Sequence, residues 1–441
     1  LINLDAYKFN SQAMLALLGL GTILLLLGVV LSKKASPVIA LTLIPILSGM
    51  LAGKTESLPT YIGEGLQAIA PTGVMFVFAI LFFGILLDAG TFQPIISRLL
   101  KLAGNDPIKI ALATATLAMM VHLDGSGAVT FLVVIPALTP IYDRLGMSRL
   151  TLVSIVALAA GTMNMLPWGG PTLRAATALN VPVTELFNPM IIPLISGLLT
   201  VFVIAFFLGK KEKNNLSPRS STEEALPHLD VQGEKRSPLF WVNVLLILLA
   251  IIIVILAIAP PFVVFMVAFA LALWINFPKV EEQKMRIDAH AKEAMLMASI
   301  LFAAGCFTGI LKGSGMMEAM ATAVETTIPA QLGNRLPLLT GLLAMPASLL
   351  FDPDSFYFGI LPLLSSTATS FGASGIEVGQ AAILGQMTTG FPISPLTGST
   401  FLLVGLAGVE LGDHQRKTIP LAFLVTLVML LVSILLGIIS I

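Results

Sequence analysis

Long apolar stretches recur along the whole chain, and they constrain its fold more than any other feature. Only 11% of the 441 residues are charged, whereas soluble proteins carry about 25%. A helix needs about 20 apolar residues to cross the hydrocarbon core of a bilayer. We therefore predict an all-α membrane protein with about ten transmembrane helices, at residues 13–31, 36–53, 69–88, 151–178, 189–209, 239–258, 261–277, 291–312, 379–408 and 418–441.

Two further apolar stretches, 109–142 and 336–370, are each interrupted near the middle by a polar tip. The first tip is Leu123–Gly127 (LDGSG) and the second is Phe351–Ser355 (FDPDS). The arms beside each tip have about 14–16 residues, which is short for crossing the bilayer core at 1.5 Å per residue. We therefore predict that both stretches are re-entrant helical hairpins, which enter and leave the membrane on the same side.

The basic residues are distributed unevenly once the hairpins are counted as non-crossing. Of the 24 lysines and arginines, 19 fall on one side of the predicted topology and five on the other, namely Lys8, Lys54, Arg174, Lys312 and Arg335. Cytoplasmic loops of membrane proteins carry the excess of positive charge. We therefore predict a multi-pass protein of the bacterial cell (inner) membrane, with both termini on the extracytoplasmic side.

The two halves of the chain resemble each other at a constant offset. Phe83–Gly90 is similar to Phe307–Gly315, and Asn164–Thr172 is similar to Thr389–Thr397. Each half has five predicted crossings, and because five is odd, the second half must be inserted upside down relative to the first. The predicted parts are a first inverted repeat at 1–209 (scaffold spans 13–88 and 189–209, hairpin 109–142, broken helix 151–178), a cytoplasmic linker at 210–238, and a second repeat at 239–441 (hairpin 336–370, broken helix 379–408).

Two of the predicted spans contain helix breakers at membrane depth, Leu166–Thr172 (LPWGGPT) and Phe391–Thr400 (FPISPLTGST). Inverted-repeat secondary transporters bind their substrates where such broken helices meet. A restarted helix has unpaired, positively polarised N–H groups, which attract carboxylates. We therefore predict a secondary transporter whose small-anion site is formed by Gly125, Ser126, Gly127, Asn164, Trp168, Gly169, Gly170, Thr172, Arg174, Ser394, Thr397, Gly398 and Ser399.

Three aspartates lie in the hairpin tips, and charged groups at that depth usually mark ion or proton pathways. Carboxylates beside an anion site repel the substrate unless a cation is bound with it, and hard oxygen ligands suit a divalent cation. We predict metal contacts from Asp124, Asp352, Asp354, Asn164 and Ser355. The alternative is that Asp124 and Asp352 only cap the helices that start at the tips.

Three other side chains near the tips and breaks have two interpretations each. His122 is a candidate for proton coupling together with Asp124 and Asp352, or else a buried packing residue. Arg174 is predicted to clamp a substrate carboxylate, the alternative being that its charged end extends to the outer surface. Trp168 either walls the site or lies at the interface between domains.

The motifs of soluble enzymes do not occur in this sequence. It has no phosphate-binding glycine-rich loop with Lys-Ser/Thr, no His-Glu-x-x-His and no paired cysteines. We predict that the protein is not an enzyme, holds no resident cofactor and takes its energy from an ion gradient. An intramembrane enzyme with Asp124 and Asp352 as a catalytic pair is another interpretation, against which the inverted repeat and the two helix breaks argue.

The tips and the first break resemble the citrate–metal:proton symporter (CitMHS) family of the ion transporter superfamily. The resemblance extends over nearly the whole chain, and its most specific pieces are Ala70–Thr72, Leu123–Gly127 and Asn164–Ala176. It implies a proton-coupled importer of citrate complexed with a divalent cation, of the Mg²⁺ or Ca²⁺ type, as co-substrate. Through the related divalent-anion:sodium symporters, it also implies a homodimer that moves a transport domain as an elevator.

The hairpin tips depart from those related sodium symporters, which carry Ser-Asn-Thr where this chain has Asp-Gly-Ser-Gly and Asp-Pro-Asp-Ser. The departure favours a bound metal over a sodium-coupled dicarboxylate. The alternative function is a metal-independent, proton- or sodium-coupled carrier of another organic acid, such as tricarballylate, gluconate or a dicarboxylate. The expected partners are the small anion with its metal, the lipid bilayer and a second copy of the chain, with no nucleic acid.

Overall fold

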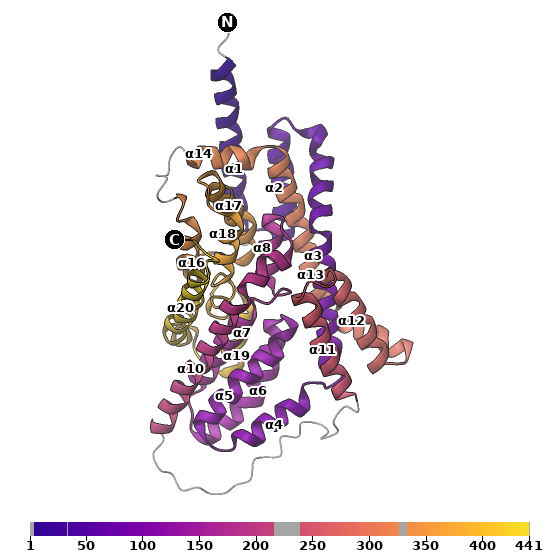
Figure 1. Ribbon diagram of the computed structural model, residues 1–441, viewed down its shortest axis with the longest axis vertical. Coiled ribbons are helices and arrows are strands. Elements are labelled where there is room, and N and C mark those ends of the chain that lie inside the picture. Colours follow the sequence, from indigo (N-terminus) through magenta and orange to yellow (C-terminus); the bar gives the residue numbers. More distant parts are fainter. Residues whose placement is uncertain (1–3, 33, 216–238, 326–332, 441) are drawn as a thin grey trace.

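Helices make up the folded chain, and no β-strand occurs in the residues that the computed structural model describes, which are 4–32, 34–215, 239–325 and 333–440 (Figure 1). Seven helical segments in these ranges are long and apolar enough to cross a membrane. The predicted all-α, multi-pass membrane fold is therefore confirmed. Most of the predicted linker, residues 216–238, lies outside the described residues.

The first half of the chain forms three long helices, a short helix, a hairpin, a broken helix and a last long helix. Short 3₁₀ helices, labelled η, join several of them. The elements are α1 (Leu4–Leu31), α2 (Pro37–Leu51), η1 (Thr55–Ser57), α3 (Leu58–Asp88), α4 (Gln93–Ala103), α5 (Pro107–Val121), η2 (His122–Asp124), α6 (Gly127–Leu145), α7 (Arg149–Met163), α8 (Gly170–Leu179), α9 (Val183–Phe187), η3 (Asn188–Met190) and α10 (Ile191–Asn215).

The second half repeats this order of elements. Its hairpin contains a π-helical segment, η4, directly after the tip. The elements are α11 (Phe240–Ile255), α12 (Pro261–Asn276), α13 (Val280–Gly313), α14 (Met316–Glu325), α16 (Leu336–Ala347), η4 (Ser355–Ile360), α17 (Leu361–Ser370), α18 (Gly375–Ile383), η5 (Phe391–Ile393), α19 (Gly398–Ala407) and α20 (Leu411–Leu435).

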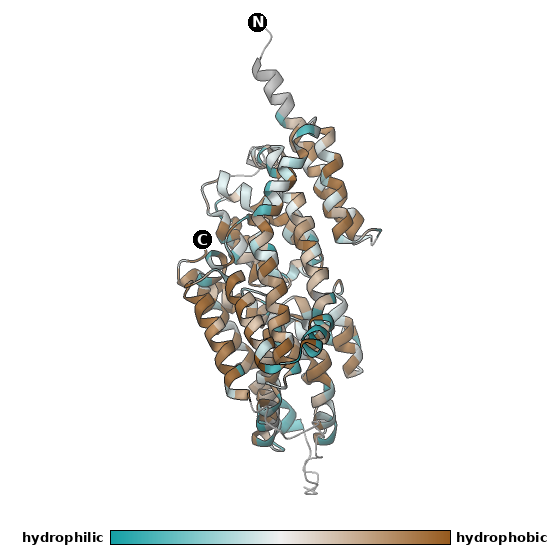
Figure 2. Ribbon diagram, turned by 90° about the vertical axis from the view of Figure 1, so that its right-hand side faces the viewer, coloured by the Kyte–Doolittle hydropathy of each residue, from teal (hydrophilic) through white to brown (hydrophobic). Residues whose placement is uncertain are grey.

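The two hairpins point toward each other from opposite ends of the molecule. In Figure 1, α5 and α6 lie in the lower half and α16 and α17 in the upper half, with the broken helix α7–α8 running between them. Helix α1 begins at the top, the C-terminal end lies in the upper half, and α10 ends at the lower edge. Figure 2 shows hydrophobic residues along most of the helices, with the hydrophilic residues gathered mainly toward the lower end.

Several helices are longer than hydropathy alone predicted. Helix α3 begins at Leu58 rather than at 69, and α13 begins at Val280 rather than at 291. The early turns of both helices contain polar residues, so the apolar pattern starts later than the helix does. The helix still forms there, because Glu, Gln and Lys are good helix formers. The hairpin helices α5 and α6 have 15 and 19 residues. Both segments of this hairpin, Pro107–Asp124 and Gly127–Leu145, are long and apolar enough to cross a membrane, so the prediction that its arms are too short to cross is wrong.

Helices α3 and α13 pack with their backbones in close contact. A Cβ atom built on Gly65 would overlap the carbonyl oxygen of Gly305, and one built on Gly309 would overlap the carbonyl oxygen of Tyr61. Glycine is therefore required at the crossing, because only a residue without a side chain lets two helices approach this closely in a membrane. This crossing joins the long helices of the two halves.

Gly65→Leu is expected to destabilise the folded protein by several kcal/mol, since forcing a side chain into a packed backbone contact costs about 1–3 kcal/mol or more. Gly63→Leu is the matched control, because a Cβ there meets no atom within 4 Å. Thermal unfolding of the two detergent-purified variants measures the difference. Equal melting temperatures would contradict the packing that we describe.

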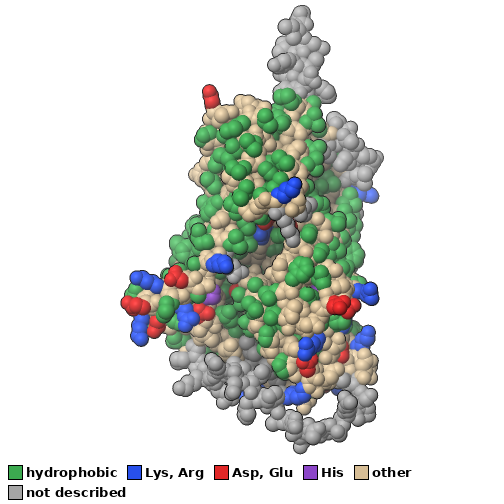
Figure 3. Space-filling model, turned by 180° about the vertical axis from the view of Figure 1, so that it is seen from behind, with side chains coloured by type: hydrophobic (Ala, Val, Ile, Leu, Met, Phe, Trp, Pro, Cys, Tyr) green, Lys and Arg blue, Asp and Glu red, His purple; other side chains and the backbone are tan. Residues whose placement is uncertain are grey.

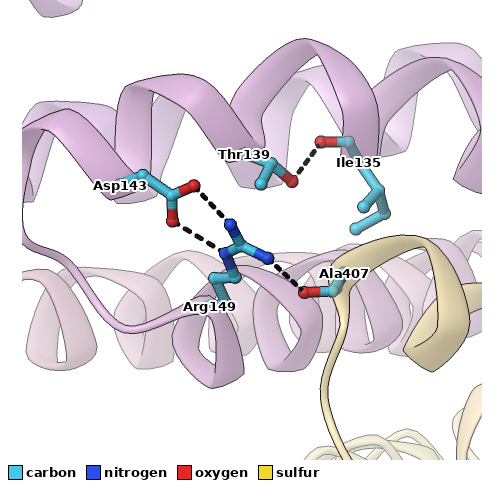
Figure 4. A network of polar contacts seen from close by, with 5 residues as sticks. All are labelled: Ile135, Thr139, Asp143, Arg149 and Ala407. Carbon is cyan, nitrogen blue, oxygen red and sulfur yellow. Dashed lines mark hydrogen bonds and ion pairs between the residues drawn. The ribbon is translucent and has the colours of Figure 1, made fainter.

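Arg149, the first residue of α7, makes polar contacts at the end of the first hairpin (Figure 4). Its Nε and Nη2 donate to the two carboxylate oxygens of Asp143 in α6, at 2.7 and 2.5 Å. Its Nη1 donates to the carbonyl oxygen of Ala407, at the end of α19, at 3.1 Å. A two-pronged arginine–carboxylate contact fixes geometry as well as charge. Arg149 thereby joins the end of the first hairpin to the end of the second broken helix, away from the cavity.

Candidate functional site

Both hairpin tips and both helix breaks line one cavity of about 460 Å³. Figure 3 shows that the surface is hollowed near the middle of one face, with charged side chains gathered over its lower part. The residues from the tips and breaks that line the cavity are Gly125, Ser126, Gly127, Ala128, Asn164, Gly170, Pro171, Arg174, Asp352, Pro353, Asp354, Met387, Phe391, Leu396, Thr397, Gly398 and Ser399. The four predicted places thus meet at one point, as the predicted site requires.

Three helix N-termini open onto this cavity. Helix α6 starts at Gly127 after the first tip, α8 starts at Gly170 after the first break, and α19 starts at Gly398 after the second break. Gly169, the N-cap of α8, has no side chain, and the side chain of Thr397, the N-cap of α19, accepts no hydrogen bond from a first-turn N–H group. The first-turn N–H groups of these helices therefore add positive partial charge at the cavity wall.

The local sequence explains why the chain breaks at these positions. Pro167 and Pro171 supply no N–H group for a continuous helix. Helix α7 ends at Met163, and Gly169 has an extended backbone directly before α8 begins. The Thr172 hydroxyl donates to the carbonyl oxygen of Met165, at 2.8 Å, across the break. In the second break, Thr397 donates to the carbonyl oxygen of Phe391, at 3.0 Å. Side chains thus replace the backbone bonds that the breaks remove.

Arg174 and Asp354 form a buried ion pair in the cavity wall. The Arg174 Nε lies 2.7 Å from the Asp354 Oδ1, and the two side chains are only 7% and 9% exposed. The pair joins the helix after the first break to the tip of the second hairpin. Arg174 was predicted to clamp the substrate and Asp354 to contact a metal, and in this structure each is the other's partner.

The other two tip aspartates, Asp352 and Asp124, accept hydrogen bonds from residues of their own tips. Asp352 accepts the N–H groups of Asp354 and Ser355, both at 3.1 Å, and the Ser355 hydroxyl, at 2.5 Å. Asp124 accepts the N–H of Ser126, at 2.8 Å. For Asp352 these are the contacts of the capping alternative, whereas the N-cap of α6 is Ser126 and Asp124 bonds within its own tip. Nowhere in the described ranges do three His, Cys, Asp or Glu side chains come together as a metal site.

Several predicted residues lie behind the cavity wall rather than in it. The Ser394 hydroxyl donates to the carbonyl oxygen of Ser348, at 2.5 Å. His122 is fully buried, with its Nδ1 2.9 Å from the Thr130 hydroxyl. The predicted residues that do not line the cavity are His122, Asp124, Trp168, Gly169, Thr172, Ser355 and Ser394.

Trp168 links the first tip to the long helices. Its indole Nε1 donates to the carbonyl oxygen of Leu123, at 2.7 Å. Its ring stacks on Phe83 of α3, with centroids 5.4 Å apart, and meets Phe265 of α12 edge-on, at 5.1 Å. Trp168 does not line the cavity and packs against α3 and α12 instead.

Polar bonds between distant segments hold the two breaks and the second hairpin together. The Asn164 amide donates to the carbonyl oxygen of Met387, at 2.8 Å, and so joins the two breaks. The Ser348 hydroxyl accepts the Met387 N–H, at 2.8 Å, and Tyr357 donates to the carbonyl oxygen of Gln386, at 2.7 Å. Sequence reasoning missed Ser348, Tyr357 and Met387, because single polar side chains and backbone groups inside apolar stretches form no pattern.

The rest of the cavity wall is apolar and was also missed. It comes from the ends of α1 and α2 and from the facing sides of α3 and α13, through Val30, Pro37, Phe76, Ile80 and Met297. In the sequence these residues look like ordinary lipid-facing or packing positions, and only the fold brings them to the site.

Comparison with known proteins gives concordant results. The sequence model of the CitMHS family, described as "Citrate transporter", matches residues 11–389. A Bacillus subtilis (strain 168) protein described as "Citrate transporter" is 42% identical over 427 residues, which cover 97% of this chain and 100% of the relative. Another from that organism, described as "Mg(2+)/citrate complex secondary transporter", is 40% identical over 439 residues, with the same coverage.

A solved structure shares the fold at low sequence identity. The YdaH transporter of Alcanivorax borkumensis, reported to have an unusual topology, superimposes with a TM-score of 0.58 at 16% identity, over 88% of this chain and 89% of that one. At this level of identity, the likeness supports the architecture and says nothing about the substrate.

Proposed function

Because the chain belongs to the CitMHS citrate transporter family, we propose that it is a secondary carrier that imports citrate complexed with a divalent cation of the Mg²⁺ or Ca²⁺ type. The relatives are named as transporters, and the protein is accordingly not an enzyme. The cation enters this proposal as part of the substrate, not as a resident metal.

The observation that carries the proposal is the mixed charge of the cavity. Three helix N-termini and Arg174 offer positive charge to carboxylates, while Asp352 and Asp354 line the same space. The two aspartates would repel a purely anionic substrate, and Arg174 would repel a bare cation. An anion that carries a cation presents both signs of charge, as the cavity does.

The membrane potential gives a physical reason to carry the two ions together. Citrate has about three negative charges at neutral pH, and each one moved against 100 mV costs roughly 2.3 kcal/mol. A divalent cation leaves about one negative charge, which symported protons would offset. This charge argument supports proton coupling, which we include in the proposal. We keep His122, Asp124 and Asp352 as the proposed proton-handling residues.

We propose the following arrangement in the membrane. The matching order of elements supports two inverted repeats at 1–209 and 239–441, joined by the linker at 210–238 in the cytoplasm. The hairpins and broken helices would move as an elevator against a scaffold of α1–α3 and α10, which are the predicted scaffold spans 13–88 and 189–209, together with α11–α13. The aromatic contact between Trp168, Phe83 and Phe265 would be part of the sliding surface. A homodimer in the bacterial inner membrane, with both termini outside, completes the proposal.

Chelation of divalent cations is expected to abolish citrate uptake. The test measures labelled citrate in proteoliposomes with Mg²⁺, with Ca²⁺ and with a chelator, each with and without an inward proton gradient. We expect uptake only with a cation, and faster uptake with the gradient. Full uptake in the chelator would overturn the metal part of the proposal. Uptake of tricarballylate, gluconate or a dicarboxylate without metal would establish the alternative function instead.

A further inference from the structure

The Arg174–Asp354 ion pair occupies the two side chains best placed to bind a charged substrate. Both residues line the cavity, and both are at least nine-tenths buried. Their contact, at 2.7 Å, joins two segments that are 180 residues apart in the chain. A Cβ built on Gly170 would lie 2.8 Å from the Arg174 Nη1, so the guanidinium is also close to the start of α8.

Removing one partner from a buried ion pair leaves the other charge uncompensated, which is strongly unfavourable. A metal-free anion that draws Arg174 away would strand the Asp354 carboxylate in the cavity wall. A bare cation that draws Asp354 away would strand the Arg174 guanidinium in the same way. Either ion alone therefore binds at the expense of a broken pair.

We infer that the substrate complex exchanges partners with this pair: a carboxylate of the complex takes Arg174 while its divalent cation takes Asp354. This inference rests on the proposed function, and it adds the reason that only the complex is accepted. After the exchange Arg174 and Asp354 each have a new partner of opposite charge, and no buried charge is left unpaired. Asp354 thus determines specificity, since it penalises every anion that arrives without a cation.

The other acidic side chain in the wall is not equivalent to Asp354. Both oxygens of Asp352 already accept hydrogen bonds from its own tip, so recruiting Asp352 would undo the cap of the following helix. The Asp354 side chain makes no capping hydrogen bond to the helix that follows it, and its Oδ1 is bound to Arg174. Among the described acids that line the cavity, Asp354 is therefore the one that a partner exchange releases.

The test compares citrate binding with Mg²⁺ and with EDTA, by calorimetry on the purified full-length protein, for wild type and Asp354→Asn. For the wild type we expect Mg²⁺ to tighten binding by about 100-fold or more, the order of magnitude for an uncompensated buried charge. In the Asp354→Asn variant, metal-free citrate can bind Arg174 without leaving a buried carboxylate unpaired. We expect the Mg²⁺ effect to fall to about tenfold or less, chiefly because binding in EDTA tightens.

Asp88→Asn is the matched control. Asp88 is also an ion-paired aspartate, 3.3 Å from Arg286 and 3.1 Å from His290, and it lies outside the cavity lining. This variant is expected to keep the wild-type effect of Mg²⁺. A similar loss of the effect in Asp88→Asn would overturn the assignment to Asp354.

The single variant Asp354→Asn leaves the Arg174 charge without its partner, which could prevent folding. The double variant Arg174→Gln/Asp354→Asn removes both buried charges and therefore provides a second test without an unpaired charge. Its citrate binding is expected to be weaker and equal with Mg²⁺ and with EDTA. An undiminished Mg²⁺ effect in either Asp354 variant would overturn the exchange while leaving the proposed function intact. Wild-type protein that binds citrate in neither condition would refute the proposed function itself, and the exchange with it.

Discussion

Replacing Arg174 with glutamine is expected to abolish citrate uptake and to lower the free energy of unfolding by about 3–5 kcal/mol, because it leaves Asp354 buried without a partner. Asp354 is 6% exposed, and Arg174 is its ion-pair partner. The substitution also removes the guanidinium that faces the cavity. Uptake in proteoliposomes and thermal unfolding in detergent measure the two effects on the same preparation.

Arg144→Gln is the control for this prediction. Arg144 makes an exposed hydrogen bond to Asn105, at 3.4 Å, away from the cavity. Contacts of this kind contribute between zero and about 1 kcal/mol, so both uptake and stability are expected to stay near wild type. If Arg174→Gln unfolded no earlier than Arg144→Gln, the buried pair would not have the energetic role that we assign to it.

Much of the architecture follows from physical limits that act locally along the chain. Hydropathy located the helices, because a crossing helix must be apolar over its length. Pro167, Gly169 and Pro171 located the first break, because they cannot continue a helix. Backbone freed at membrane depth must line a cavity or be buried in protein. That requirement predicted that Gly125, Asn164 and Thr397 would meet, and all three line one cavity.

Pairings between distant residues could not be predicted in the same way. The charge of Arg174 and its nearness to the first break indicated an anion, yet nothing in one sequence shows that Asp354 lies beside it. Trp168 was identified, but its partners Phe83 and Phe265 are ordinary apolar residues in their own helices. Helix ends were misjudged at Leu58 and Val280, because polarity stops an apolar pattern before it stops a helix.

Asn164→Leu is expected to reduce citrate uptake about 100-fold while the protein still folds, since a displacement of about 1 Å at a binding site can cost that much. The amide of Asn164 donates to the carbonyl oxygen of Met387, at 2.8 Å, and bonds the two breaks directly. Leucine has a similar size and cannot donate. The Met387 carbonyl would lose its partner in a buried position, which costs about 1–3 kcal/mol.

Met387 makes this position sensitive, because its backbone has a φ of +53°. A residue other than glycine held in the left-handed region costs on the order of 1–3 kcal/mol, and it stays there only when surrounding bonds require it. The bonds from Asn164 and Ser348 supply that requirement. Without the first of them, we expect the second break to relax and the start of α19 to leave its place in the cavity wall.

Asn188→Leu tests whether the effect belongs to the site. Asn188 also donates its amide to a backbone carbonyl, that of Ile255, at 3.2 Å, and it lies outside the cavity lining. Its loss should cost some stability and leave uptake by the folded protein within about twofold of wild type, because the two breaks stay joined. Equal uptake by the Asn164 and Asn188 variants would mean that the Asn164–Met387 bond does not position the site. A selective loss in Asn164→Leu would show that the two halves of the chain must be held together at their breaks for transport.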